Sequence, residues 1–369
     1  MRLKGLLINY RECIIGSLHF LRLKCFPHSM GRSPQALLLE VNPFHGEVLP
    51  GYADYLQKLG FEVTVLTRYS TYRDSPFCRM EKQPRHYCLT PLGMRLFLTK
   101  EQGKGFDFIL YASSRLFLFE YRFLGTIATF WGGYLPEGRQ GYALIEHDLN
   151  EKQDPDINHL FLLTKWNYNG HMIPMCNPHT FGKCLTANHK LKSKRVFITV
   201  GKVVASQRDF NGLTQAMKHL AGDYDFELWI VGIPKEKSLL SLLPEGRIKI
   251  LGRLSFARLY DAMEMADFFL PLLEPETHAK YLRGCTSGSR QLVMGFNIPP
   301  IMHEAFAEHY GFTKDSCLTY TDDATFADAL FYALNMDEKE YECRKSSLEM
   351  IAQDVYRESL DNLKGMIAT

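Results

Sequence analysis

Two strands joined by a helix near the start of the chain constrain its fold more than any other feature. Residues 36–41 are a short apolar run that predicts a buried strand, and residues 48–59 predict a helix that Gly60 closes. Residues 61–66 predict the next strand. A strand, a helix and a second strand within about thirty residues form a βαβ unit, which implies a parallel sheet.

The same series begins again at residue 195. Strands are predicted over residues 195–200 and 226–231, each followed by a glycine, with a helix over 213–220 between them. A third strand over 247–251 and a second helix over 256–265 follow. The first half has further candidate strands at 106–111, 142–146 and 160–163, whereas residues 67–103 show no clear pattern. Because strands and helices alternate in both halves, the predicted fold class is α/β, with two doubly wound, Rossmann-like domains facing each other across a cleft.

This pattern divides the chain into five parts. We expect an N-terminal extension over residues 1–33, a first α/β domain over 34–173, a linker over 174–194, a second α/β domain over 195–345 and a C-terminal helix over 346–369. The expected linker is rich in Pro, Asn and Lys, which is typical of a connection between domains.

Composition argues against several classes of function. The chain has 369 residues and a net charge of +2, without a basic stripe interleaved with aromatic residues, so we expect no nucleic-acid partner. Its nine cysteines show neither a CxxC motif nor a Cys/His spacing suited to zinc, which predicts no metal site and fits reduced thiols. No run of about 18 apolar residues and no secretory signal are recognisable, so we expect a cytoplasmic protein.

The first 33 residues combine positive charge with an apolar stripe of helical period. They hold six Lys and Arg residues against Glu12 alone, a net charge of +5. The stripe comprises Leu3, Leu7, Tyr10, Ile14, Leu18 and Leu21. A basic amphipathic helix can lie on an anionic membrane surface, here the inner membrane, and we expect it to contribute little to either core. The alternative is a helix that packs between domains.

A candidate anion site lies within residues 266–300. Residues 267–273 predict a buried strand, and residues 290–296 predict a helix. A small, hydroxyl-rich turn precedes this helix and consists of Thr286, Ser287, Gly288 and Ser289. Backbone N–H groups at the start of a helix lie at the positive end of its dipole and bind anions. The alternative is that a serine only caps the helix and that Gly288 only permits a tight turn.

Four segments of the second half follow one another in a recognisable order. They are Gly201-Lys202 with Arg208, Glu227 to Gly232, Leu251 to Leu254, and Ala266 to Pro271. In this order they resemble the nucleotide-binding half of glycosyltransferases with the GT-B fold. In the first half, His45 to Tyr52 with Leu59 to Phe61 resembles the acceptor half of the bacterial family-four, or group-one, members that build surface polysaccharides. The resemblance covers about residues 36–335.

The resemblance implies a donor site around the predicted anion site. In the family, a basic pair after the first strand of the second half neutralises the donor diphosphate, and Lys202 and Arg208 occupy this place, one residue further apart than usual. The donor-binding residues implied are Lys202, Arg208, Gly232, Thr286, Ser287, Gly288, Ser289 and Gln291. Two cations and helix N–H groups stabilise the charge of a departing diphosphate without a metal or a cofactor. The alternative is that both cations are solvated loop residues.

The chain departs from the family at one motif. Retaining members often carry two glutamates separated by seven residues, but the corresponding positions are Leu292 and a site near Gly284. Gln291, beside the second position, can bind a ribose hydroxyl, and Glu276 is a candidate catalytic contact to the sugar. Alternatively, Gln291 is an ordinary helix residue and Glu276 is a solvated loop glutamate. The stereochemical course of the reaction therefore stays open.

Three residues of the first half are candidates for the acceptor side. His147 follows the strand predicted over 142–146 and is the candidate catalytic base for an acceptor hydroxyl. His45 and Glu47 lie on the loop after the first strand. Alternatively, His147 is a structural histidine, and Glu47 stabilises the first turn of the next helix.

Together these features predict a transferase that moves a sugar from a nucleotide diphosphate onto a glycan or lipid-linked acceptor in surface polysaccharide synthesis. A sugar-nucleotide epimerase on a similar fold is one alternative, which a pair of carboxylates would favour. A non-catalytic, two-lobed binding protein is another, which an export signal would favour. An NAD-dependent oxidoreductase is disfavoured, because no G-x-G-x-x-G follows the first strand of either half.

Overall fold

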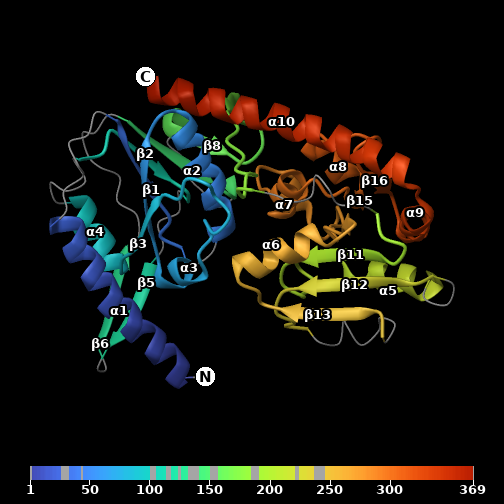
Figure 1. The fold of residues 1–369 in the computed structure, drawn as a ribbon, viewed down its shortest axis with the longest axis horizontal. Helices are drawn as coiled ribbons and strands as arrows, with labels where there is room; N and C mark the ends of the chain where they lie inside the picture. Colours follow the sequence, from blue (N-terminus) through green and yellow to red (C-terminus); the bar gives the residue numbers. More distant parts are fainter. Residues whose placement is uncertain are drawn as a thin grey trace. The chain divides into compact units, whose positions relative to one another are not determined.

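The computed structural model describes residues 2–25, 33–42, 45–99, 105–113, 118–123, 126–131, 141–149, 157–183, 191–220, 224–236 and 246–368. The chain forms two compact units, which Figure 1 colours along the sequence. Unit 1 comprises Met1–Gly182 together with Glu358–Thr369, and unit 2 comprises Lys183–Arg357. Among the described residues, no helix combines the length and the apolar character needed to cross a membrane.

Unit 1 is built on a six-stranded sheet in which neighbouring strands are parallel. The strand order is β3-β2-β1-β4-β7-β8, with bounds Arg85–Cys88, Glu62–Thr67, Gln35–Leu39, Phe108–Tyr111, Tyr142–Glu146 and Leu160–Leu162. β1 is buried along its whole length, in agreement with the apolar run that predicts it. The order reverses between β1 and β4, and in doubly wound sheets ligands bind beyond the carboxyl ends of the strands at such a reversal.

Short helices and two hairpins complete the connections of unit 1. The helical segments are η1 (Gly46–Val48), α2 (Leu49–Lys58), α3 (Tyr69–Asp74), α4 (Pro91–Thr99) and η4 (Ile157–His159). The hairpins pair β5 with β6 (Leu118–Phe123, Thr126–Trp131) and β9 with β10 (Trp166–Tyr168, His171–Ile173). The stretch 67–103, which has no clear sequence pattern, holds α3, β3 and α4. β3 is a short edge strand with mostly half-exposed residues, so its apolar run is too weak to be recognised.

Helix α1 (Arg2–Cys25) packs against β3, α3 and α4 of unit 1. Leu23 is buried in the same core cluster as Leu37 and Phe97. Glu12 is also buried, and its two carboxylate oxygens accept hydrogen bonds from the guanidinium of Arg68. The expectation that residues 1–33 add little to either core is therefore wrong for this helix.

Unit 2 contains a parallel sheet with the same strand order. Its first four strands lie in the order β13-β12-β11-β14, with bounds Ile248–Gly252, Phe226–Val231, Arg195–Val200 and Phe268–Phe269. A second parallel pair, β15 (Ile301–His303) and β16 (Leu318–Tyr320), is joined to β14 by a bridge between Phe269 and Pro300. Both units are thus doubly wound α/β domains, and the predicted fold class is confirmed.

Helical segments follow β11, β13, β14, β15 and β16 of unit 2. They are α5 (Phe210–Leu220), α6 (Phe256–Glu264), η7 (Ala279–Leu282), α7 (Ser289–Phe296), α8 (Glu304–Tyr310) and α9 (Asp323–Asn335). Aromatic rings fill the core between them, and the rings of Phe197 and Phe268 stack with centroids 5.8 Å apart. The hydroxyl of Tyr341 donates to the backbone oxygen of Asp267 over 2.9 Å, which fixes the start of the last helix on this core.

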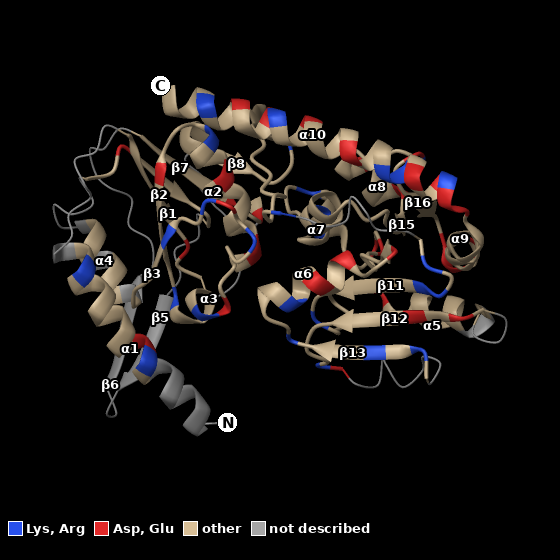
Figure 2. Cartoon of the chain, in the orientation of Figure 1, with Lys and Arg blue, Asp and Glu red and all other residues tan. Residues whose placement is uncertain are grey.

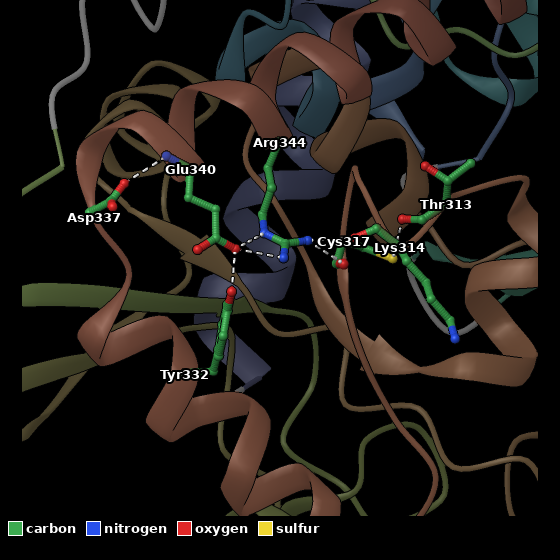
Figure 3. A network of polar contacts seen from close by, with 7 residues as sticks. All are labelled: Thr313, Lys314, Cys317, Tyr332, Asp337, Glu340 and Arg344. Atoms are coloured by element: carbon green, nitrogen blue, oxygen red, sulfur yellow. Dashed lines mark hydrogen bonds and ion pairs between the residues drawn. The ribbon is translucent and has the colours of Figure 1, made fainter.

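Helix α10 (Glu338–Ala368) begins in unit 2, and its last turns belong to unit 1. Acidic and basic residues are interspersed along it (Figure 2). At its start, Glu340 accepts from the Tyr332 hydroxyl over 2.7 Å, and Arg344 donates both to Glu340 and to the backbone oxygen of Cys317 (Figure 3). The boundary expected at residue 345/346 falls inside this helix, because no Gly or Pro interrupts residues 338–364.

Two glycines pack against each other at the ends of β11 and β12, and this contact predicts a large effect of substitution. Gly232 has a φ of 151°, and a Cβ atom there would lie 1.7 Å from the backbone oxygen of Gly201. We expect Gly232→Ala to lower the free energy of unfolding by roughly 2–4 kcal/mol, because backbone must move to remove the clash. Urea denaturation measures the difference.

The matched control is Gly246→Ala, which also places alanine at positive φ, 80°, but meets no atom within 4 Å. This variant should lose only roughly 1–2 kcal/mol, the strain of the left-handed backbone. Equal losses in the two variants would contradict the steric argument.

Candidate functional site

In unit 2, the loop after β11 meets the start of α7 beyond the carboxyl ends of β11 and β14. Arg208 lies at this meeting point and is almost fully buried. Its guanidinium donates to the backbone oxygen of Val200 over 2.9 Å and to the hydroxyl of Ser289 at 3.4 Å. The strand order of the sheet reverses between β11 and β14, so this is the position at which α/β sheets bind ligands.

The partners of the Arg208 guanidinium are neutral. Besides Val200 and Ser289, it donates to the backbone oxygen of Gln207 over 2.7 Å, while its Nε atom has no partner. Among the described residues no carboxylate pairs with it. Burial lowers the pKa of Arg208, and the nearby Tyr281 and Tyr310 act in the opposite direction. A buried cation without a neighbouring anion is costly, so the arrangement is suited to a bound anionic group.

The start of α7 supplies the other side of this site. The Ser287 hydroxyl donates to the Ser289 hydroxyl over 3.1 Å, and the backbone N–H of Ser287 donates to the Tyr310 hydroxyl over 3.3 Å. Gly288 is exposed, and a Cβ added to it would meet no atom within 4 Å. Both serines are buried and directed into the cluster, so the exposed backbone at Gly288 is the part of the turn that a ligand can approach.

The two glycines at the strand ends make room for Arg208. A Cβ on Gly201 would lie 2.8 Å from Nη2 of Arg208, and Gly232 packs directly on Gly201. Gly232 therefore acts on this site through the backbone of Gly201. The expected role of Gly232 in donor binding stays a prediction.

The other predicted donor-site residues differ in their exposure. Thr286 is half-buried next to Ser287, whereas Lys202 and Glu276 are exposed on their loops. Gln291 is completely buried in α7, and both polar atoms of its side-chain amide lack a partner. Among the contacts of the described residues, none joins the Glu276 carboxylate to Arg208 or Ser289. The roles of Lys202, Gln291 and Glu276 stay predictions.

In unit 1, polar groups gather at the equivalent end of the sheet. Glu40 directly follows β1 and is completely buried. Its carboxyl group accepts from the Ser113 hydroxyl, beyond β4, over 2.6 Å and from the backbone N–H of Asn42 over 2.7 Å. Burial, the largest influence, raises the pKa of Glu40 to about 7, although the hydrogen bonds and His45 oppose this shift. A carboxyl group with this pKa can hold or release a proton near neutral pH.

His45 and His147 stack on one another next to this carboxyl group. Their ring centroids are 4.2 Å apart, and Nε2 of His147 lies 2.7 Å from the backbone oxygen of Ala112. With Nε2 donating to this oxygen, Nδ1 of a neutral His147 is free of its proton. His45 has a φ of 61°, an unusual conformation for a residue with a side chain, and such strain occurs often at functional sites.

Glu47 completes the group of titratable residues in unit 1. One of its carboxylate oxygens lies 3.7 Å from Nδ1 of His45. Burial acts to raise the pKa of Glu47, but His45, a backbone hydrogen bond and, more weakly, His147 together lower it further than burial raises it. The structure thus brings together all three acceptor-side residues predicted from the sequence: His45, Glu47 and His147.

Sequence reasoning did not identify several residues of these two clusters. Glu40, Ser113, Tyr281 and Tyr310 were not among the candidates, and neither was Arg290, whose buried guanidinium lies 5.8 Å above the ring of Tyr310. Glu40 is 73 residues from Ser113, so only the parallel pairing of β1 with β4 brings them together. A buried-strand pattern that ends in a glutamate is the only signal in the sequence.

The chain matches no known family model and no curated protein sequence. It is similar in structure to a glycosyltransferase from Rickettsia africae, with a TM-score of 0.57 and 12% identity over 91% of this chain and 99% of that chain. HepE from Anabaena, solved with UDP and glucose, gives a TM-score of 0.54 and 11% identity over 91% of this chain and 98% of its own. The chain therefore has the GT-B fold, which the resemblance of its sequence predicts.

A third similar structure widens the range of chemistry found on this fold. Sucrose-phosphate synthase from Thermosynechococcus elongatus has a TM-score of 0.53 and 11% identity, covering 89% of this chain and 97% of that chain. At such low identity the comparisons establish the fold alone. The assignment of chemistry to this chain therefore depends on its own residues.

The raised pKa of Glu40 predicts a specific pH dependence of stability. An acid whose pKa is higher in the folded than in the unfolded state binds more protons when folded, so stability falls as pH rises from about 4.5 through about 7. Glu40→Gln removes this titration and keeps an oxygen for Ser113. As the pH rises from 4.5 to 8, the free energy of unfolding of the variant should increase relative to that of the native protein by up to about 3 kcal/mol, at about 1.4 kcal/mol per pKa unit. Urea denaturation at several pH values measures it.

The control is Glu62→Gln in the same unit. The pKa of Glu62 is lowered, chiefly by its hydrogen bond to Lys82, so this carboxylate is ionised in both states above pH 5. Its stability difference from the native protein should be the same at pH 6 and pH 8. A constant difference for Glu40→Gln over this range would show that Glu40 is ionised in the folded protein.

Proposed function

We propose that this protein is a glycosyltransferase that transfers a sugar from a nucleotide diphosphate. The observation that carries the proposal is the buried guanidinium of Arg208, whose partners among the described residues are all neutral and which lies against the N-terminal turn of α7. A diphosphate supplies the missing negative charge and accepts hydrogen bonds from backbone N–H groups. The fold shared with HepE, solved with UDP and glucose, supports this donor class.

Cleavage of the sugar–phosphate bond moves negative charge onto the departing nucleoside diphosphate. In the proposed mechanism Arg208 and the turn 286–289 stabilise that charge as it develops, which lowers the barrier more than it strengthens donor binding. Lys202, on the loop that leads from β11 to Arg208, adds a second positive charge. In this proposal the cations of unit 2 perform the charge stabilisation without a metal.

The acceptor hydroxyl must lose a proton when the new bond forms. We assign acceptor binding to unit 1, where Nδ1 of His147 is the candidate base and His45 and Glu47 complete the site. The acceptor class that we propose is a growing glycan or its lipid-linked precursor at a membrane surface. The resemblance of residues 45–52 and 59–61 to the acceptor half of transferases that build surface polysaccharides supports a role in polysaccharide synthesis.

Removing the Arg208 guanidinium should weaken binding of the donor nucleotide. We expect Arg208→Ala to raise the Kd for the best nucleoside diphosphate by 10- to 150-fold, or about 1.5–3 kcal/mol, the contribution of a hydrogen bond to a charged group. A thermal-shift screen with UDP, GDP, CMP and ADP identifies the base, and calorimetry then gives the Kd. Arg258→Ala, at an exposed position of α6, is the control and should bind normally.

The same variant distinguishes a transferase from a binding protein. Transfer by Arg208→Ala should fall by a larger factor than donor affinity, because the charge on the leaving group is greatest in the transition state. Radiolabelled donor with lipid-extract or glycan acceptors measures transfer. If the native protein binds the nucleotide but transfers sugar to no acceptor, the binding-protein alternative is favoured. If the native protein interconverts the donor sugar, the epimerase is favoured.

Replacing the candidate base should affect turnover without affecting the donor. His147→Asn keeps a polar side chain but removes the basic nitrogen, so we expect kcat to fall 10²- to 10⁴-fold, roughly the range for general bases. The Kd for the nucleotide should not change, since its proposed site lies in unit 2. His171→Asn, on the exposed hairpin of unit 1, is the control. Normal turnover by His147→Asn would exclude His147 as the base.

A further inference from the structure

We propose that the outer face of α1 is a docking surface for an anionic lipid bilayer. This apolar face consists of Tyr10, Ile14, Leu18 and Leu21, whose exposed fractions are 62%, 49%, 59% and 57%. The inference extends the proposed function, because it names the part of the chain that holds the enzyme at a membrane carrying the acceptor. It depends on the contacts of α1 within unit 1 and not on the donor site.

Specific contacts fix which side of α1 faces the protein. Glu12 is paired with Arg68 and accepts from the backbone N–H of Tyr69, and Nδ1 of His19 accepts from the backbone N–H of Cys88 over 3.0 Å. Gly16 lies close to Thr90, since a Cβ on it would be 3.2 Å from the Thr90 backbone nitrogen. A larger side chain at position 16 would push the helix away.

The inner and apolar faces lie on opposite sides of the helix. Residues along an α-helix are rotated by about 100° each, so positions 12, 16, 19 and 23 share one side and positions 10, 14, 18 and 21 share the other. A surface helix ordinarily turns its apolar stripe toward the core and its polar stripe toward water. In α1 four large apolar residues face outward, whereas the side that faces the protein holds a glutamate, a glycine and a histidine beside the buried Leu23.

The charges beside the apolar face indicate which partner covers it. Arg11 and Arg22 are exposed and lie at the border of this face, about a quarter turn from its centre. Glu12 is the only acidic residue in the first 33 and is neutralised by Arg68 behind the helix. Apolar side chains with basic residues along the edge are the pattern of helices that lie in the headgroup region of an anionic membrane.

A second copy of the chain is a less suitable partner. A symmetric contact between two apolar faces would bring Arg11 and Arg22 of both copies together, in a region whose net charge is +5. An anionic bilayer instead attracts these side chains and accommodates the apolar ones. The side chains of Leu3 and Leu7, which continue the stripe in the sequence, lie outside those that the structure describes.

Co-sedimentation with lipid vesicles tests the proposal on the full chain. Vesicles of equal parts phosphatidylglycerol and phosphatidylcholine should bind the native protein, and vesicles of phosphatidylcholine alone should bind it at least tenfold more weakly. Added salt should weaken binding to the anionic vesicles, because it screens the basic residues. The double variant Leu18→Ser with Leu21→Ser should bind at least tenfold more weakly than the native protein, as should Arg11→Gln with Arg22→Gln.

Two controls separate this inference from folding and from the donor site. Met172→Ser removes an apolar residue that is 63% exposed on β10 of unit 1, and it should bind vesicles like the native protein. All variants should keep the native melting temperature and the native affinity for the nucleotide, so loss of nucleotide binding would concern the proposed function alone. Native-like vesicle binding by both double variants would overturn the proposal. A concentration-dependent dimer that the Leu18/Leu21 variant abolishes would assign the face to a second copy instead.

Discussion

The candidate site of unit 2 depends on one buried guanidinium. Arg208 joins the loop after β11 to the start of α7 by donating to Val200 and to Ser289. It fits there because Gly201 has no side chain, and Gly201 in turn has a glycine, Gly232, as its neighbour. The hydrogen-bond partners of Arg208 satisfy its two NH2 groups but not its Nε–H group, and among the described residues no carboxylate balances its charge. The local fold therefore carries a free-energy cost that the binding of an anion relieves.

Unit 1 places the opposite kind of group at the same end of an equivalent sheet. Glu40 follows β1, as Gly201 follows β11, and its burial favours the protonated form instead of a charge. Two stacked imidazoles lie beside it. The two sheets have the same topology, but the strand ends carry a cation in unit 2 and groups with exchangeable protons in unit 1. Sugar transfer needs both kinds of group, because a phosphate leaves and a hydroxyl loses its proton.

The sequence predicts the parts of this structure that depend on local pattern. Strands such as β11 and β12 are predominantly apolar runs, because both faces of a parallel sheet are covered, and their bounds are confirmed. β3 is missed because an edge strand needs no such run. Contacts between distant residues are also missed. The Glu40–Ser113 and Arg208–Ser289 pairs span 73 and 81 residues. Of these four residues, the sequence predicts only Ser289, through the hydroxyl-rich turn before a helix, and Arg208, through the family resemblance.

Helix α1 shows where periodicity alone leaves a fold undetermined. The spacing of Tyr10, Ile14, Leu18 and Leu21 defines an apolar side, but it does not say whether that side faces the core or the solvent. Glu12 decides this, because it lies opposite the stripe and its carboxylate reaches Arg68, 56 residues further along the chain. Turning the apolar side inward would break this ion pair and move Gly16 away from Thr90, where only a small residue fits. The contacts that anchor the helix are therefore the same contacts that leave its apolar side exposed.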